Sequence, residues 1–544
     1  MKPTHSIRVS LIVCIVLMCM AFGVYSFVRL NALDERRDFD LCTLVPQDVE
    51  AVFATDKLTD FIEAIDCMGC SRDHHFLYAS DLFSCVKRYL RMLMEREPHG
   101  LSGQMNEMLI SFHPSDLKND QVLYCKLGLE DREMLESYIK QYGSSSFPSK
   151  TFGYRGQEIS IYSLSDGRFL SLWMKRDFLV VSFQKRLVEQ VIDTWKSGKS
   201  LLRLENFRPA VQARQEARKS VLFLRWKNLG ERPQADSADY RDVWLEFDMK
   251  LSEEGIYCAG AAYGVSAADT CRYAFAGCHP VAGFPGVELP QSTLLYRCEA
   301  LPVDMAGWQH VLSHCAADSL TAAEGERFDH LLVAYLLEHA QGQVVSCSFS
   351  PLDSSFAKPR QVLGIELKDV GAAQRDLHTL LYDISQGQYP FYKNFSAVTG
   401  IGGMRLYRLP SGCLIAKLAA DKRGQTYGYA TFYQNRLLIA AEEDALAAYV
   451  KELKQKNCLE RSPVYGAMVE QLSPVYDFVL MADMETMALN PLLTTGMLPS
   501  FFETHFDFFR HFQLAIQVCR VDGVICPNIV LLYRLKDAVS ESSS

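Results

Sequence analysis

The chain has 544 residues, of which 49% are hydrophobic and 22% are charged. This is the composition of a folded globular protein, and it excludes a disordered, collagenous or coiled-coil chain. Because 56 basic residues stand against 65 acidic ones, the formal net charge is -9. The basic excess typical of nucleic-acid-binding proteins is absent, so we expect no nucleic-acid partner.

An apolar segment near the N-terminus predicts a membrane anchor. Residues 11–28 carry no charge and, at about 1.5 Å per helical residue, would span roughly 27 Å, close to the thickness of a bilayer core. Residues 1–10 contain Lys2 and Arg8 but no acidic residue, which favours a cytoplasmic N-terminus followed by an exported chain. We therefore expect a single-pass inner-membrane protein with a periplasmic bulk and a juxtamembrane linker at residues 29–43. The alternative is a cleaved signal peptide, because small residues stand at cleavage spacing near the end of the apolar segment.

The cysteines suggest one disulfide. The chain has 17 cysteines, and two of them lie in the apolar segment. Near the C-terminus two predicted strands flank the two-residue turn Asp522-Gly523, and this places Cys519 directly opposite Cys526. The pair could form a disulfide or remain as two reduced thiols.

The same sequence landmarks occur twice, in the same order and at a nearly constant offset. The step Val45-Pro46-Gln47 recurs as Leu289-Pro290-Gln291, and Gln121-Val122-Leu123 recurs unchanged as Gln361-Val362-Leu363. Gly255 in one turn corresponds to Gly523 in another. The order predicts a tandem duplication, with repeat unit 1 at 44–266, a glycine-rich and proline-rich linker at 267–286, repeat unit 2 at 287–536 and a disordered tail at 537–544.

Each predicted copy combines short strands with amphipathic helices. Hairpins are predicted at 161–167 and 406–412, and strand–helix units at 179–195 and 437–453. Short strands joined by hairpin turns pair mainly antiparallel. We therefore predict an α+β fold of two tandemly duplicated units, each a mainly antiparallel sheet with packed helices, preceded by one transmembrane helix.

Several short patterns fall short of a chemical site. Ser102 lacks the second glycine of a nucleophile elbow, and the Gly-Lys-Ser at 198–200 lacks the first glycine of a phosphate-binding loop. Cys67 and Cys70 are followed by a histidine pair but not by the second ligand pair of a structural zinc site. We predict no catalytic, cofactor-binding or metal-binding residues and no cofactor.

A phenylalanine-rich segment is the strongest candidate for an interface. Ser500 and Glu503 stand at capping-box spacing, which predicts a helix start, and six phenylalanines follow on one broad helical arc. They are Phe501, Phe502, Phe506, Phe508, Phe509 and Phe512. The segment could seal the junction between the repeats, or it could be an exposed docking patch for a partner or a membrane.

The N-terminal anchor, the strand opened by a Val-Pro or Leu-Pro step and the paired α+β units together resemble an uncharacterised family of N-terminally anchored bacterial envelope proteins, a domain of unknown function. The resemblance covers the chain from Leu44 onward and implies a bacterial, extracytoplasmic setting. We expect a non-catalytic binding or scaffold protein of the cell envelope, attached to the membrane by its N-terminal helix and bound to another envelope protein. The alternatives are a hydrolase of envelope glycan or peptide with a site between the repeats, and an assembly or chaperone-like factor.

Overall fold

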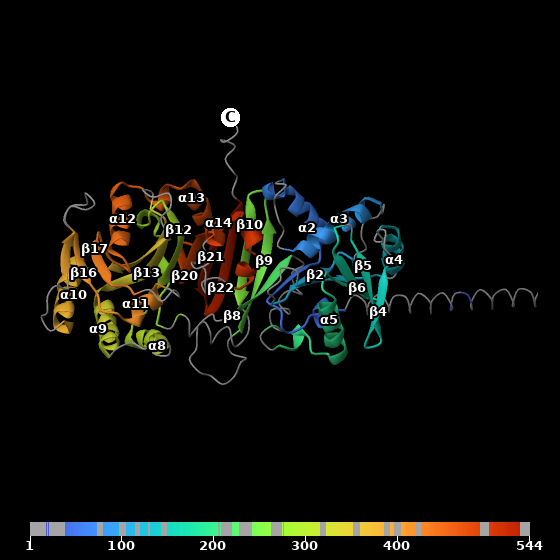
Figure 1. The fold of residues 1–544 in the computed structure, drawn as a ribbon, viewed down its shortest axis with the longest axis horizontal. Coiled ribbons are helices and arrows are strands. Elements are labelled where there is room, and N and C mark those ends of the chain that lie inside the picture. The colour runs from blue at the N-terminus through green and yellow to red at the C-terminus, as the bar shows by residue number, and fades with distance from the viewer. Residues whose placement is uncertain are drawn as a thin grey trace, which may run out of the picture. The chain divides into compact units, whose positions relative to one another are not determined.

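The fold is described from a computed structural model (Figure 1). The described residues are 18, 20, 39–72, 80–96, 105–114, 120–128, 131–142, 149–164, 166–204, 207, 220–227, 242–262, 275, 277–315, 323–351, 359–385, 392–395, 404–419, 426–489 and 500–533. Within this part of the chain, no helix combines the length and the hydropathy needed to cross a bilayer. Of the predicted anchor at 11–28, only Met18 and Met20 are described, both helical, and residues 1–10 and the tail at 537–544 lie outside the described residues.

The fold is α+β with antiparallel sheets, as predicted. The described residues up to Ile62 and from Ser80 to Leu204 form a first compact unit. Its strands pair antiparallel in the order β4-β5-β6-β7-β3-β2-β1. Their bounds are β1 Ala51–Thr55, β2 Met108–Phe112, β3 Gln121–Lys126, β4 Lys150–Tyr154, β5 Gln157–Ser163, β6 Phe169–Met174 and β7 Phe178–Ser182.

Helices cover both faces of this first sheet. They are α3 Asp81–Arg96, α4 Asp131–Tyr142 and α5 Lys185–Ser197, with the short 3-10 turns η1 Leu41–Leu44 and η3 Leu201–Arg203, while α2 Leu58–Cys67 and η2 Gly69–Arg72 fall where the units divide. Figure 1 shows α3 and α5 on opposite sides of the strands. The amphipathic α5 buries Leu187, Val191 and Ile192 and packs on β6 and β7, which confirms the predicted strand–helix unit at 179–195.

The second unit contains a longer antiparallel sheet. The paired order of its strands is β8-β9-β10-β22-β21-β20-β12-β13-β14-β18-β17-β16-β15. Their bounds are β8 Val221–Lys227, β9 Asp242–Leu251, β10 Gly255–Ala262, β12 Thr293–Ala300, β13 Ala340–Phe349, β14 Arg360–Leu367, β15 Tyr392–Phe395, β16 Met404–Arg408, β17 Tyr429–Tyr433, β18 Arg436–Ala440, β20 Phe478–Asp483, β21 Phe512–Val521 and β22 Val524–Tyr533.

Two hydrophobic cores lie on the two faces of this longer sheet. On β18, Leu437 and Ile439 enter one core while Leu438 and Ala440 enter the other, as the alternation of side chains along a strand requires. Figure 1 shows α12 and α13 on one side and α8, α9 and α11 on the other. The helices of this unit are α8 Met305–Cys315, α9 Ala323–His339, α10 Val370–Ile384, α11 Cys413–Leu418, α12 Glu443–Lys454, α13 Pro463–Val469, α14 Met484–Leu489, α15 Ser500–Thr504 and α16 Phe506–Phe509, with 3-10 turns η5 Gly286–Glu288 and η6 Leu459–Arg461.

The predicted hairpin at 406–412 is wrong. Strand β16 ends at Arg408, and Gly412 is instead the N-cap residue of α11. The carboxylate of Asp329 accepts hydrogen bonds from the amides of Cys413 and Leu414, at 2.9 and 3.3 Å, and so caps that helix from α9. A Cβ on Gly412 would lie 2.1 Å from Asp329 Oδ1, so glycine is required there for close approach and not for a turn.

The predicted linker at 267–286 does not separate the compact units. Its end forms β11 Val281–Ala282, which pairs with β19 Val475–Tyr476 in a small two-stranded sheet. The units divide instead at Leu204 and Glu205, because β10 forms a ladder with β22 and so belongs to the longer sheet.

Candidate functional site

The junction between β10 and β22 is the central feature of the second unit. The two strands run antiparallel, from Gly255 opposite Leu532 to Ala259 opposite Asn528. In Figure 1 they lie side by side, and in the paired order of the longer sheet they follow β8 and β9. A Cβ on Gly255 would lie 2.2 Å from the carbonyl oxygen of Leu531, so the strands approach closely because this residue has no side chain.

An open groove of about 590 Å³ lies over this junction. Charged, amide and aromatic side chains share its wall, so it suits a polar partner more than an apolar ligand. The lining residues are Lys250, Ser252, Glu253, Glu254, Tyr257, Cys258, Ala259, Gln471, Asn528, Ile529 and Val530. Burial raises the pKa of Cys258 to about 12, so this thiol is neutral at physiological pH and is a poor nucleophile.

A serine, a histidine and an aspartate come together in the first unit. Ser111 Oγ on β2 lies 2.9 Å from Nε2 of His113, and His113 Nδ1 lies 3.7 Å from Oδ1 of Asp48. The hydroxyl of Tyr124 lies 3.2 Å from Ser111 Oγ, and the side-chain amide of Gln190 on α5 donates to Asp48 Oδ2 at 2.8 Å. The residue types and their order match those of a serine hydrolase triad.

The exposure of Ser111 and Asp48 is the reverse of what a serine hydrolase needs. Ser111 is 0% exposed, whereas the side chain of Asp48 is 54% exposed. In a working triad the carboxylate is buried and the serine faces the substrate. The cluster therefore satisfies buried polar groups between β2 and the rest of its unit, and it presents no accessible nucleophile.

The neighbouring His113 ring lowers the pKa of Asp48 to about 2, the hydrogen bond from Gln190 adds to the effect, and partial burial opposes it. Burial raises the pKa of Tyr124 well above its usual value, because a phenolate would lose its hydration there. At physiological pH Asp48 is therefore charged and Tyr124 is neutral.

The phenylalanine-rich segment does not form one helix, and this prediction is wrong. Two short helices, α15 and α16, are interrupted at His505, whose φ of -111° and ψ of 34° are not helical. The His505 ring hydrogen-bonds through Nδ1 to the carbonyl oxygen of Phe501, at 2.9 Å. Phe512 is the first residue of β21 and stands opposite Tyr533, because pairing with the neighbouring strands outweighs the helical spacing of the phenylalanines.

Most of the six phenylalanines are buried. Phe501, Phe502, Phe509 and Phe512 are between 0% and 6% exposed, and Phe506 and Phe508 are half-buried. The rings of Phe501, Phe502, Phe508, Phe509 and Phe512 form one aromatic cluster, in which the centroids of Phe502 and Phe509 are 4.6 Å apart. Helix α15 packs against β8, a strand that the predicted boundaries assign to repeat unit 1.

The cysteine pair occupies the predicted positions. Cys519 on β21 is directly opposite Cys526 on β22, and the turn residues Asp522 and Gly523 have positive φ angles of 52° and 80°, as a two-residue hairpin turn requires. The two thiols are not bonded to each other. Burial raises the pKa of each thiol, and the disulfide stays a prediction.

The short sequence patterns that fall short of a chemical site occupy ordinary structural positions, as far as they lie within the described residues. Gly198 ends α5 in the left-handed conformation and donates its amide to Thr194 O at 2.9 Å, which places the Gly-Lys-Ser sequence at a helix C-terminus, away from any phosphate-binding N-terminus. Cys70 is buried and Cys67 is exposed. The two histidines that follow them lie outside the described residues.

Sequence reasoning missed both the groove and the polar cluster. His113 follows Ser111 by two residues, but two strands and two α-helices separate it from its partner Asp48, so no local spacing in the sequence predicts the contact. The groove is assembled from two hairpins and the turn that follows α13. No protein-family model, no curated protein and no solved structure matches the chain.

Proposed function

We propose that the protein is a non-catalytic binding protein of the bacterial envelope, and that the groove over β10 and β22 receives a segment of a partner protein. The observation that carries the proposal is this open groove of about 590 Å³, with Lys250 and Glu254 at its charged wall and Tyr257 beside them. Tyrosine is enriched in surfaces that bind polypeptide, and charged side chains are typical of their polar rims. In this proposal residues 11–28 anchor the chain in the inner membrane and the bulk is periplasmic, as in the envelope family that the sequence resembles.

A tandem duplication is part of the same proposal. It is supported by strand order, because β4-β5-β6-β7-β3-β2-β1 in the first unit has the same sequence of connections as β15-β16-β17-β18-β14-β13-β12 in the second. The run β8-β9-β10 likewise matches β20-β21-β22. On this reading β10 and β22 are equivalent strands, and antiparallel pairing of equivalent strands gives a local twofold axis. The groove would then lie on that axis.

The burial of these phenylalanines supports the interpretation that their segment seals the junction between the two repeats. Helix α15 lies against β8 of the proposed first repeat, while Phe512 belongs to β21 of the second. Four buried rings would together contribute several kcal/mol, at about 2 kcal/mol for each large apolar side chain removed from water. We infer that the segment seals the two repeats.

Two features favour binding over the hydrolase alternative. Glu253 and Glu254 are consecutive and exposed in the turn between β9 and β10, whereas a carboxylic acid that donates a proton at neutral pH is usually desolvated. Among the described residues, the hydroxyl that lies against a histidine in a triad-like arrangement is that of Ser111, and it is fully buried.

Site-specific photocrosslinking tests the proposal in intact cells. A photoreactive amino acid at Tyr257 is expected to capture one envelope protein, whereas the same amino acid at the exposed Phe169 on β6 should not capture that protein. The charge reversals Lys250→Glu and Glu254→Lys should each reduce the yield from Tyr257 several-fold. Equal yields from Tyr257 and Phe169, or yields unchanged by the reversals, would contradict a binding role for the groove. A partner captured only during envelope growth would favour the assembly-factor alternative.

The membrane part of the proposal has its own test. Intact-mass measurement of the mature chain distinguishes an uncleaved anchor from a cleaved signal peptide. Recovery in the soluble periplasmic fraction with a shortened N-terminus would contradict the anchor.

A further inference from the structure

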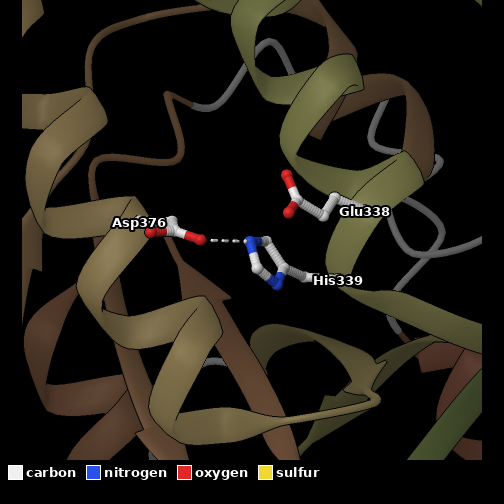
Figure 2. Close-up of side chains that lie close together, drawn as sticks. All are labelled: Glu338, His339 and Asp376. Atoms are coloured by element: carbon white, nitrogen blue, oxygen red, sulfur yellow. Dashed lines mark ion pairs between the residues drawn. The ribbon is translucent and has the colours of Figure 1, made fainter.

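Three side chains with metal-binding groups converge between two helices of the second unit (Figure 2). Glu338 and His339 end α9, and Asp376 lies in the second turn of α10. One ligand atom from each residue lies within 4.8 Å of the ligand atoms of the other two. Figure 2 shows the His339 ring directed at the Asp376 carboxylate, with Glu338 beside it.

His339 is held firmly in this position. The residue is 5% exposed, and its ring lies 4.8 Å from the ring of Tyr335, centroid to centroid. The Tyr335 hydroxyl donates to the carbonyl oxygen of Ala373 at 3.0 Å and so ties α9 to α10. The backbone carbonyl of His339 accepts from the amide of Lys368 at 2.9 Å. The imidazole is therefore fixed before any ligand arrives, which reduces the cost of binding one.

One nitrogen of this buried ring lacks a hydrogen bond. His339 Nε2 lies 2.9 Å from Asp376 Oδ2, yet within the described residues it has no partner that meets the angular requirement of a hydrogen bond. A buried ring nitrogen normally finds a partner, because an unsatisfied polar atom has lost its hydrogen bond to water without a replacement. An ion placed between the imidazole and the carboxylates would satisfy it.

The surrounding charge favours a cation. Glu338 and Asp376 are exposed, so an ion could enter from solvent and keep water in its remaining coordination positions. The side chain of Lys368 is directed at the carbonyl oxygens of Leu337 and Glu338, at 3.3 and 3.0 Å, so its charge caps the end of α9.

We propose that Glu338, His339 and Asp376 bind a divalent first-row transition metal ion. One imidazole nitrogen with two carboxylate oxygens is a ligand set used for Zn²⁺, Fe²⁺ and Mn²⁺, whereas Mg²⁺ and Ca²⁺ prefer oxygen ligands alone. The ion would clamp the end of α9 to α10. This site is independent of the groove, and its failure would leave the proposed binding role intact.

The test uses Mn²⁺ with the full-length, chelator-treated protein. Mn²⁺ is the appropriate probe because thiolates bind it poorly, so the many cysteines of the chain compete little. Electron paramagnetic resonance of free Mn²⁺ should show one saturable site per chain, and Zn²⁺ should displace the ion because it binds such ligands more tightly. His339→Ala and Asp376→Asn should each weaken binding at least about tenfold, since loss of even an outer-shell partner costs about that much. The matched control is His330→Ala, which removes an exposed histidine from the same helix and should leave binding unchanged.

A second measurement, the melting temperature, distinguishes a variant that has lost a metal ligand from one that does not fold. Binding of Mn²⁺ to the native state should raise the melting temperature of the wild-type and His330→Ala proteins but not that of Asp376→Asn. The half-exposed Asp376 is the safer position if His339→Ala does not fold. No saturable Mn²⁺ binding, or binding that both ligand variants retain, would overturn the proposal.

Discussion

At the scale of single residues, the direction of exposure decides what a polar cluster can do. Ser111, His113 and Asp48 have the contacts of a hydrolase triad, yet the hydroxyl is buried and the carboxylate is exposed. The proposed second repeat has Ser350 at the position that corresponds to His113. The cluster is therefore a stabilising feature of the first unit and no part of a repeated active site.

The lowered pKa of Asp48 predicts a specific pH dependence. Because its pKa in the folded protein is about 2, below the ordinary 3.8, its stabilising contribution is complete above about pH 4 and is lost as the pH falls towards 2. The carboxylate is half-exposed, so the contribution should not exceed about 1 kcal/mol. In Asp48→Asn we expect a melting temperature about 2–4 °C lower at neutral pH, with the difference disappearing near pH 2. Asp60→Asn, with a carboxylate that is 67% exposed, should show no comparable change, and a constant difference at every pH would contradict the assignment.

At the scale of elements, the C-terminal segment shows how tertiary pairing overrides local periodicity. Spacing alone favours one helix through Phe512, but β21 begins at that residue and pairs with β20 on one side and β22 on the other. A strand flanked on both sides satisfies every backbone group of the segment, whereas one more helical turn would leave a gap in the sheet. The helical part consequently shortens to α15 and α16.

Truncations within the phenylalanine-rich segment should separate buried from half-buried rings. We expect Phe502→Ala, at a residue 2% exposed, to destabilise the protein by about 3–5 kcal/mol, because it leaves a cavity as well as losing buried area. Phe506→Ala should cost clearly less, and Phe169→Ala, at a residue 60% exposed, should be close to neutral. Thermal unfolding of the three variants provides the measurement. Equal effects of Phe502→Ala and Phe169→Ala would show that the cluster does not stabilise the fold.

At the scale of the whole molecule, the β10–β22 ladder holds the second unit together. It joins β8, β9 and β10 to the sheet that contains β12 to β18 and β20 to β22. Sheets joined through one strand pair depend on close approach of the two backbones, and Gly255 permits it.

A methyl group at this junction should be costly. In Gly255→Ala the new Cβ would meet the Leu531 carbonyl oxygen at 2.2 Å, so we expect a loss of about 1–3 kcal/mol and a weakened β10–β22 pairing. Hydrogen exchange should then report faster exchange of the amides of both strands. The control Gly428→Ala, whose added Cβ has nothing within 4 Å, should exchange like the wild type. Unchanged exchange in Gly255→Ala would mean that the junction is not formed by this ladder.

The sequence by itself determined the α+β class, the strand–helix units around α5 and α12, and the hairpin that sets Cys519 opposite Cys526. These depend on side-chain periodicity and turn chemistry within about ten residues, which are local properties of the chain. Only the tertiary structure decided that β10 pairs with β22, that Phe512 is a strand residue, and that Asp376 meets His339 across two helices. Such contacts join distant segments, and their register depends on burial and on competing strand partners, neither of which a local pattern records.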